Sequence, residues 1–176
     1  LRGDLLDSLR TVYSYGMDIF AGFIVGFDVD DATIFDRQYE FIQQSGIAVS
    51  MVGLLSALPK TPLYERLAAA GRLRDFVARD NTRPATNVIP QNMTYDEMVD
   101  GYIQLMQRLT DDRAIDERIG RKLAYLKDPV TSPHLTLARK LQYFGRLLWH
   151  GVVAGGPRRA FYFFRTMART RLKPAA

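Results

Sequence analysis

Three aspartates that follow an apolar segment are the residues of this sequence best suited to chemistry. The stretch Met17–Asp31 has the β-branched and aromatic composition of a strand buried on both faces. It ends in Asp28, Asp30 and Asp31, whose carboxylates could act as a general base or bind a cation. Acids after a strand more often cap the next helix, so we expect Asp30 or Asp31 to be a helix cap.

Two glycines, Gly22 and Gly26, interrupt the apolar run and leave room for a ligand or another backbone to approach the strand. They do not form the dinucleotide-binding fingerprint, because that motif needs its glycines in the turn that opens a helix. Ligands of parallel sheets bind beyond the carboxyl ends of the strands. We therefore predict the functional site at Gly26–Asp31.

Other catalytic groups are scarce. The chain has no cysteine, which excludes a disulfide, a thiolate nucleophile and a cysteine-ligated metal site within it and favours a cytoplasmic origin. The two histidines, His134 and His150, have no acidic neighbour in the sequence, so neither a Ser-His-Asp triad nor a histidine metal site is expected. We predict no catalytic residue and no metal ligand. No apolar run reaches about 18 residues, so no membrane-spanning helix is expected.

Apolar periodicity predicts a helix on either side of the first strand and a second strand after them. The first helix, Asp4–Tyr15, ends at Gly16, and the second runs from about Asp31 to Gly46. Ile47–Leu55 then forms a second apolar strand, and the helical crossover makes the two strands parallel. Because the sequence starts inside a helix, we expect a fragment of a longer protein.

The middle of the chain contains a loop and three further helices. A short helix ends at Gly71, and the polar segment Arg72–Pro90 is expected to be a long surface loop. A capping box at Thr94 and Glu97 begins another helix, which reaches Thr110. The last one begins at Ala114 and ends at Lys127, and its residues expected to point inward are Ile115, Ile119, Leu123 and Leu126.

The C-terminal residues carry all of the excess positive charge. Residues 129–176 hold nine of the 24 lysines and arginines and none of the 19 acidic residues, which leaves 15 basic against 19 acidic residues before them. Two helices are expected here, Leu135–Val153 and Pro157–Leu172. Helical spacing places three arginines on one face of the second, namely Arg158, Arg165 and Arg169.

Two interpretations of this basic face remain open. It could bind an anionic membrane surface or an acidic partner, or its arginines could be solvated while the opposite aromatic face packs on the domain. Nucleic acid is not expected as a partner, because no nucleic-acid-binding motif accompanies the charge. The expected location is cytoplasmic, and peripheral to the membrane if the basic face binds lipid.

Several segments are informative in their order and spacing. The first set is the run GFIVGFD at Gly22–Asp28, the helix after it, and the second strand with LLSALPKTPLYERL and AAAGRL. This set resembles the last part of the barrel of radical S-adenosylmethionine enzymes. The later segments TNVIPQNMTYDEM and GYIQLMQRL are similar to the C-terminal region of the cobalamin-binding branch of that superfamily, which includes hopanoid-type methylases and relatives of the anaerobic cyclases. The resemblance spans roughly Leu1–Arg121.

The resemblance implies a set of site residues. In the family a GxIxGxxE pattern on the fifth barrel strand lies beside the adenine of S-adenosylmethionine. Gly22, Ile24 and Gly26 match this pattern, whereas Val29 stands where the family has its acid. The implied partial S-adenosylmethionine site consists of Gly22, Ile24, Gly26, Phe27, Asp28 and Asp30, in which one of the two aspartates replaces the missing acid. The implied substrate-side residues follow the second strand and are Leu54, Ala57 and Pro59.

The resemblance also implies a fold. Residues 1–72 would form half of a TIM-type barrel with a parallel βαβ unit, so the fold class is α/β. Residues 73–128 would form a loop and a mainly α-helical extension, and residues 129–176 a basic amphipathic helical tail.

The implied function is that of a larger enzyme. The parent would be a cobalamin-dependent radical S-adenosylmethionine enzyme that transfers a methyl group to, or otherwise modifies, a lipid-like or tetrapyrrole-like substrate. Its four-iron four-sulfur cluster and its cobalamin would be bound outside this chain, which lacks the family's CxxxCxxC loop. The chain would then be inactive alone and would have the rest of the parent polypeptide as its partner. The alternative is a free-standing interaction module whose basic tail binds an anionic membrane or an acidic partner.

Overall fold

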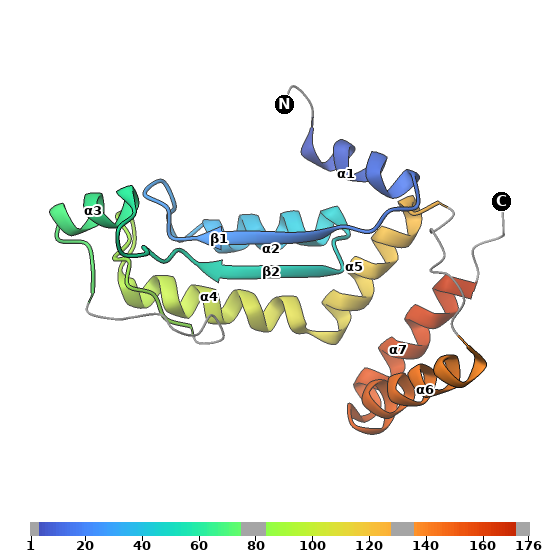
Figure 1. Ribbon diagram of the computed structural model, residues 1–176. Coiled ribbons are helices and arrows are strands. Elements are labelled where there is room, and N and C mark those ends of the chain that lie inside the picture. The colour runs from blue at the N-terminus through green and yellow to red at the C-terminus, as the bar shows by residue number, and fades with distance from the viewer. Residues whose placement is uncertain (1–3, 75–83, 128–135, 172–176) are drawn as a thin grey trace. The chain divides into compact units, whose positions relative to one another are not determined.

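The computed structural model describes residues 4–74, 84–127 and 136–171, which form two parallel strands and seven α-helices (Figure 1). The fold class is therefore α/β, as predicted, and helices predominate. In chain order the elements are α1 (Leu5–Ser14), β1 (Phe20–Val25), α2 (Ile34–Ser45), β2 (Val49–Leu54), α3 (Pro62–Ala69), α4 (Tyr95–Thr110), α5 (Asp112–Tyr125), α6 (Leu137–Leu148), the π-helical turn η1 (Trp149–Val153) and α7 (Gly156–Arg171). The half-barrel stays a prediction, and His134 lies outside the described residues.

The chain divides into two compact units, each built from separate stretches of sequence. The strand unit consists of Phe20–Phe41 and Val49–Leu109 and contains the sheet, α3, α4 and most of α2. The helical unit consists of Leu1–Ile19, Ile42–Ala48 and Thr110–Ala176. The domain boundaries predicted at residues 72 and 128 stay a prediction.

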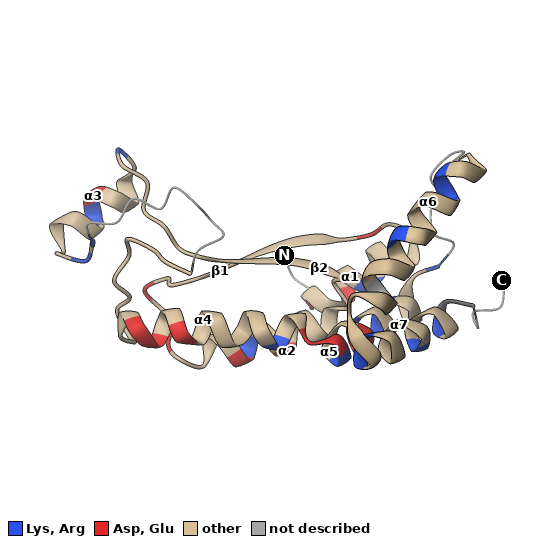
Figure 2. Ribbon diagram, turned by 90° about the horizontal axis from the view of Figure 1, so that it is seen from below, with Lys and Arg blue, Asp and Glu red and all other residues tan. Residues whose placement is uncertain are grey.

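The sheet has one covered face. β1 and β2 pair in parallel along their whole lengths, which confirms the predicted βαβ unit. α2 and α4 lie on the same side of this pair (Figure 2). The ring of Phe23 contacts the ring of Phe41 on α2 edge-on, with 6.0 Å between centroids. Tyr102 on α4 donates a hydrogen bond of 3.2 Å to the carbonyl oxygen of Val52.

The other face of the strand pair is exposed within the strand unit, and we call it the open sheet face. It consists of Phe20, Gly22 and Ile24 on β1 and Val49, Met51 and Gly53 on β2. Phe20 is 70% exposed and Met51 is 68% exposed. The prediction that β1 is buried on both faces is therefore wrong for the described residues, because both covering helices pack on one side.

A glycine allows α4 to approach α2 closely. A Cβ atom at Gly101 would lie 2.2 Å from Cε2 of Phe35, a buried residue of α2. That separation is far shorter than a van der Waals contact, so a larger residue here would push the two helices apart. The spacing of the layer that covers the sheet thus depends on Gly101.

Helix ends follow the signals in the sequence. Gly16, Gly46 and Gly71 have φ angles of 76°, 71° and 66° and follow the last turns of α1, α2 and α3, as predicted. At the start of α4 the hydroxyl of Thr94 accepts a hydrogen bond of 3.2 Å from the N–H of Glu97. The Glu97 carboxylate accepts one of 2.7 Å from the N–H of Thr94, which confirms the capping box.

The segment Arg72–Pro90, predicted as a long surface loop, has neither helix nor strand in its described residues, but part of it is not at the surface. Thr86, Asn87 and Val88 are buried in the strand unit. The prediction fails because the polar side chains of Thr86 and Asn87 bond to backbone groups that follow β2, which removes the cost of burying them. Residues 75–83 of this segment lie outside the described residues.

The helix predicted at Ala114–Lys127 is present as α5, but the residues predicted to point inward are not its most buried ones. The buried residues are Ala114, Asp116 and Arg118, whereas the four apolar residues predicted to point inward are only partly buried. Asp116 is buried because α7 packs against α5 with arginine side chains that bond to it. The apolar period therefore did not predict which residues of α5 are most buried.

Candidate functional site

The loop Gly26–Asp31 at the carboxyl end of β1 is tightly constrained by its own residues. Gly26 has a φ of 112°, which residues with a side chain rarely adopt. A Cβ atom at this position would lie 3.1 Å from the sulfur of Met98 on α4 and 3.4 Å from Cβ of Leu55. The glycine is thus required both by its backbone conformation and by the space around it.

Asp30 orders this loop from inside. It is 5% exposed, and its Oδ2 accepts hydrogen bonds of 2.9 Å from the N–H of Gly26 and 3.0 Å from the N–H of Phe27. These bonds pair two backbone donors at the strand end and satisfy a buried carboxylate. Asp30 therefore binds the end of the strand and is not the cap of α2.

Asp31 serves the turn that leads into α2. Its carboxylate accepts hydrogen bonds of 2.9 Å from the N–H and 2.5 Å from the hydroxyl of Thr33. The hydroxyl bond, followed by the backbone bond, lowers the pKa of Asp31. Of the two acids expected to cap α2, Asp31 is the one that bonds to the chain at the helix start.

Asp28 links the loop to the chain that follows β2. Its carboxylate forms ion pairs with Arg66 on α3 and with Arg72, the latter at 2.8 Å. Its carbonyl oxygen accepts a hydrogen bond of 2.8 Å from Asn92. The hydrogen bonds from Arg66 and then Arg72 hold the pKa of Asp28 below its usual value. Asp28 is consequently an ionised group that links the loop after β1 to α3, to Arg72 and to Asn92.

The remaining residues of the predicted cofactor site lie on or beside the open sheet face. Gly22 has no atom within 4 Å of a Cβ built on it, so the space above it is open. Ile24 is 48% exposed and Phe27 is 46% exposed. These three positions offer an apolar surface, whereas the N–H groups of Gly26 and Phe27 are already bonded to Asp30. Binding of a flat apolar ring by side chains is what this arrangement supports.

The predicted substrate-side residues are in three different environments. Ala57 is 2% exposed and packs with Leu67 and Val88 in a buried cluster. Leu54, the last residue of β2, is half-buried, and Pro59 is exposed. Only Leu54 and Pro59 are therefore accessible to a ligand in the strand unit.

Sequence reasoning missed the residues that hold the chain after β2 in place. The side chain of Asn87 donates to the carbonyl oxygen of Ala57 at 2.7 Å and accepts from its N–H at 2.9 Å. The hydroxyl of Thr86 donates to the carbonyl oxygen of Leu55. The Asn87 side chain thereby forms the two hydrogen bonds that the backbone of a neighbouring strand would form with Ala57, which is 30 residues away in sequence. The two loops that end the strands are thus fixed by polar side chains.

The three basic-face arginines of α7 are paired with acids of the helical unit. Arg158 donates to Asp111 at 2.7 Å, and Arg165 donates through Nε to Asp116 at 2.7 Å. Arg169 reaches the same carboxylate of Asp116 at 3.2 Å. The side chain of Asp116 is 2% exposed, so these contacts form the polar centre of the α5–α7 packing.

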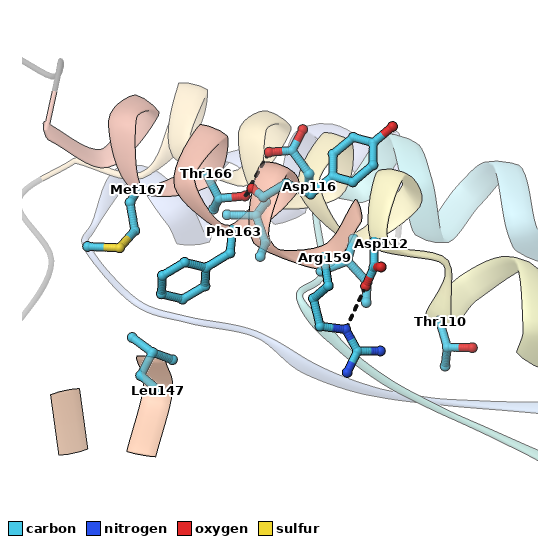
Figure 3. A pocket seen from close by; sticks show the side chains of 11 residues that line it. Thr110, Asp112, Asp116, Leu147, Arg159, Phe163, Thr166 and Met167 are labelled. Atoms are coloured by element: carbon cyan, nitrogen blue, oxygen red, sulfur yellow. Dashed lines mark hydrogen bonds and ion pairs between the residues drawn. The ribbon is translucent and has the colours of Figure 1, made fainter. Parts of the chain in front are cut away.

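A cavity of about 610 Å³ lies in the helical unit and is shown in Figure 3. Its lining is mainly apolar and comes from α5, α6 and α7. The apolar residues include Ile115, Ile119, Leu147, Phe163 and Met167. Four of its polar side chains are bonded in pairs, Arg159 to Asp112 at 3.0 Å and Thr166 to Asp116 at 2.7 Å. The cavity therefore fits an apolar group.

Neither metal ligands nor a membrane span occur in the part of the chain that the structure describes. No three His, Cys, Asp or Glu side chains gather there in a way that could hold a metal ion. No helix among those residues is both long enough and apolar enough to cross a membrane.

The chain is similar to one protein family and to several proteins that are named as methylases or methyltransferases. The family described as "Domain of unknown function (DUF4070)" matches residues 61–175. The hopanoid C-2 methylase of Rhodopseudomonas palustris is 28% identical over 167 residues, which cover 91% of this chain and 31% of that protein. An uncharacterized methyltransferase of Synechocystis sp. is 31% identical over 119 residues, or 66% of this chain and 22% of that protein.

A third relative is named for a bacteriochlorophyllide. The bacteriochlorophyllide d C-12(1)-methyltransferase of Chlorobaculum tepidum is 28% identical over 114 residues, or 65% of this chain and 25% of that protein. The chain thus spans less than a third of the length of each of these relatives. No solved structure matches it.

Proposed function

We propose that this chain, which belongs to the DUF4070 family, is the C-terminal part of a cobalamin-binding radical S-adenosylmethionine methylase and serves a cobalamin-dependent methyl transfer. The proposed substrate is lipid-like or tetrapyrrole-like. Two relatives carry a hopanoid and a bacteriochlorophyllide in their names, which supports both classes. The match over residues 61–175 carries the proposal, since it joins α3 through α7 to that family.

The open sheet face supports a role in which this chain completes a larger barrel. A two-stranded sheet that exposes one apolar face to water is only marginally stable, so we expect further polypeptide to cover that face. We propose that the strand unit forms the end of a TIM-type barrel and that the rest of the parent polypeptide is its partner. In such a barrel α2 and α4 lie outside, and the open sheet face lies inside.

The residues at the end of β1 suit the adenine of S-adenosylmethionine in part. Ile24 and Phe27 supply exposed apolar side chains, and Gly22 leaves open space above the strand. When bound, the cofactor would supply the methyl group and the radical chemistry, and these residues would only position its adenine. They do not suit an iron-sulfur cluster, because the chain has no cysteine to provide thiolate ligands.

Gly22 offers a sharper test of the S-adenosylmethionine site than Gly26. A side chain at Gly26 clashes with Met98, so loss of binding there could reflect a distorted loop. A side chain at Gly22 meets no atom within 4 Å, so Gly22→Leu leaves this chain intact and fills the space proposed for the adenine. Gly145→Leu is the matched control, because Gly145 also has no atom within 4 Å of its Cβ position.

The measurement is equilibrium binding of S-adenosylmethionine to the full-length parent protein with its cluster reconstituted. We expect Gly22→Leu to weaken binding by at least about tenfold, the effect of losing roughly 1.4 kcal/mol of binding free energy, and Gly145→Leu to have no effect. Equal affinity of the two variants would refute the proposed site.

A second measurement treats the 176-residue chain alone with iron and sulfide. Formation of a bound cluster would refute the proposal that the cluster is held elsewhere.

The free-standing interaction module is the less favoured alternative. The family match and the methyltransferase relatives cover most of the chain, including α3 and α4, which such a module would use only as a scaffold. An upstream coding sequence without three clustered cysteines would favour the module.

A further inference from the structure

The strongest unassigned surface of the molecule is one side of α6. Its exposed apolar residues, with their exposed fractions, are Leu137 at 72%, Leu141 at 62%, Phe144 at 45% and Leu147 at 50%. At 100° per residue, Leu137, Leu141 and Phe144 fall within a stripe about 60° wide. An apolar stripe of this kind is normally packed against another element, but here it faces outward.

Basic side chains lie beside and opposite this stripe, with Lys140 next to it and Arg139 and Arg146 on the opposite side of the helix. Arg139, Lys140 and Arg146 are all exposed, and no ion pair joins any of them to another residue in the described part of the chain. Lys and Arg are present on α6 and acidic residues are absent from it (Figure 2). Residues 129–176 contain no aspartate or glutamate at all. The cations of α6 are therefore available for an external anion.

The side of α6 that adjoins the stripe at Phe144 is hollowed. A depression of about 630 Å³ is lined by Lys140, Tyr143, Phe144, Arg146, Leu147 and His150. Its apolar lining comes from Tyr143, Phe144 and Leu147, and the basic side chains of Lys140 and Arg146 lie beside them. Trp149, which follows the last turn of α6, is 60% exposed. Tryptophan and tyrosine prefer the boundary between lipid headgroups and acyl chains, where one part of the ring system is apolar and the other is hydrated.

We propose that α6 binds the surface of an anionic lipid bilayer, lying in the plane of the membrane with its apolar stripe among the acyl chains. The 12-residue helix is about 18 Å long, too short to cross a hydrocarbon core of about 30 Å. In-plane helices that bind acidic headgroups have an apolar face and an opposite polar face rich in lysine and arginine, as α6 has. The exposed Trp149 suits the boundary between headgroups and acyl chains.

The proposal keeps the lipid partner expected for the C-terminal residues and moves the contact from α7 to α6. The arginines Arg158, Arg165 and Arg169 already bond to acids of the helical unit. Using them for headgroups would leave Asp116, which is buried, without its partners. Binding of headgroups by the cations of α6 breaks no ion pair within the described residues.

Leu147 lines both the surface depression and the apolar cavity between α5 and α7, so an acyl chain at the surface lies close to that cavity.

The chain contains a single reporter of this surface. Trp149 is its only tryptophan, so its fluorescence comes from the end of α6 alone. The 176-residue chain is mixed with phosphatidylcholine vesicles, with or without phosphatidylglycerol, at low salt and at high salt. We expect a blue shift of the emission and sedimentation with the vesicles only when phosphatidylglycerol is present. High salt should weaken this binding, because exposed charges are screened.

Two matched variants separate α6 from the rest of the chain. Leu141→Glu places a charge in the stripe, whereas Leu5→Glu makes the same change at a 54% exposed leucine of α1, in the same unit. We expect Leu141→Glu to weaken vesicle binding by more than about tenfold and Leu5→Glu by less than about twofold. Lys140→Gln should weaken it by about fivefold, which corresponds to the roughly 1 kcal/mol of one basic residue at an anionic surface.

Three outcomes would overturn the proposal. Equal binding to vesicles with and without phosphatidylglycerol would assign the attraction to exposed apolar surface elsewhere, such as the open sheet face. Unchanged binding of Leu141→Glu would remove α6 from the contact. A change in the oligomeric state on Leu141→Glu, without vesicle binding by the unmodified chain, would show that a second copy covers the stripe.

Discussion

Replacement of the buried Asp116 by asparagine should destabilise the helical unit more than the same kind of replacement at an exposed acid. The carboxylate is 2% exposed and accepts hydrogen bonds from Arg165, Arg169 and Thr166, the last at 2.7 Å. Removing one member of a buried ion pair costs about 3–5 kcal/mol. The two arginines are 35% and 41% exposed and can regain water, so we expect Asp116→Asn to cost about 3 kcal/mol, near the lower limit.

Thermal unfolding followed by circular dichroism measures this effect. For a chain of 176 residues, about 3 kcal/mol corresponds to a fall in Tm of roughly 6–12 °C. Glu117→Gln is the control on the same helix, since the Glu117–Arg113 pair is 36% and 67% exposed and should contribute less than about 1 kcal/mol. A double-mutant cycle with Arg165→Met should give a coupling energy above about 1 kcal/mol. Equal effects of Asp116→Asn and Glu117→Gln would show that the polar centre of the α5–α7 packing is not what holds these helices together.

Three further predictions concern single side chains. The arginines hold the pKa of Asp28 below its usual value, so Asp28→Asn should lower stability at neutral pH. In acid titrations of unfolding, that difference should shrink as the pH falls below about 4 towards the lowered pKa. Burial raises the pKa of Tyr13 to about 12, so this tyrosine should titrate last in ultraviolet absorbance. Its contribution to stability should be lost as the pH rises from about 10 through 12, and Tyr13→Phe should abolish that loss. Asn87→Ala leaves the buried N–H and C=O of Ala57 without partners and should cost about 3 kcal/mol in urea unfolding; a cost below about 1 kcal/mol would contradict the bridging role.

Local signals in the sequence predicted the helices and strands well because they depend on nearest neighbours. The glycines that follow α1, α2 and α3 and the capping box of α4 act over three or four residues, so their meaning can be read directly from spacing. The parallel pairing of β1 with β2 followed in the same way from the single helix between them. These predictions needed no knowledge of tertiary contacts.

The contacts that fix the strand ends could not be predicted, because they join residues distant in sequence. Arg66 and Arg72 pair with Asp28 across 38 and 44 positions, and Asn87 bonds to Ala57 across 30. Nothing in the composition of Arg72–Pro90 distinguishes a buried polar side chain with partners from an exposed one without them. The burial of Asp116 on α5 could not be predicted for the same reason, since an acid is an interior residue only when the partner helix brings cations to it.

The acids that first suggested chemistry at the end of β1 have structural roles in this chain. Asp30 bonds to two backbone amides, Asp31 bonds to the turn before α2, and Asp28 is neutralised by two arginines. Each of the three carboxylates is bonded to donors of the chain itself. The accessible groups at this end of the strand are apolar instead, namely Ile24, Phe27 and the open position above Gly22. A site in which the polar groups hold the backbone and the apolar groups face outward suits the placement of a cofactor whose reactive parts are bound elsewhere.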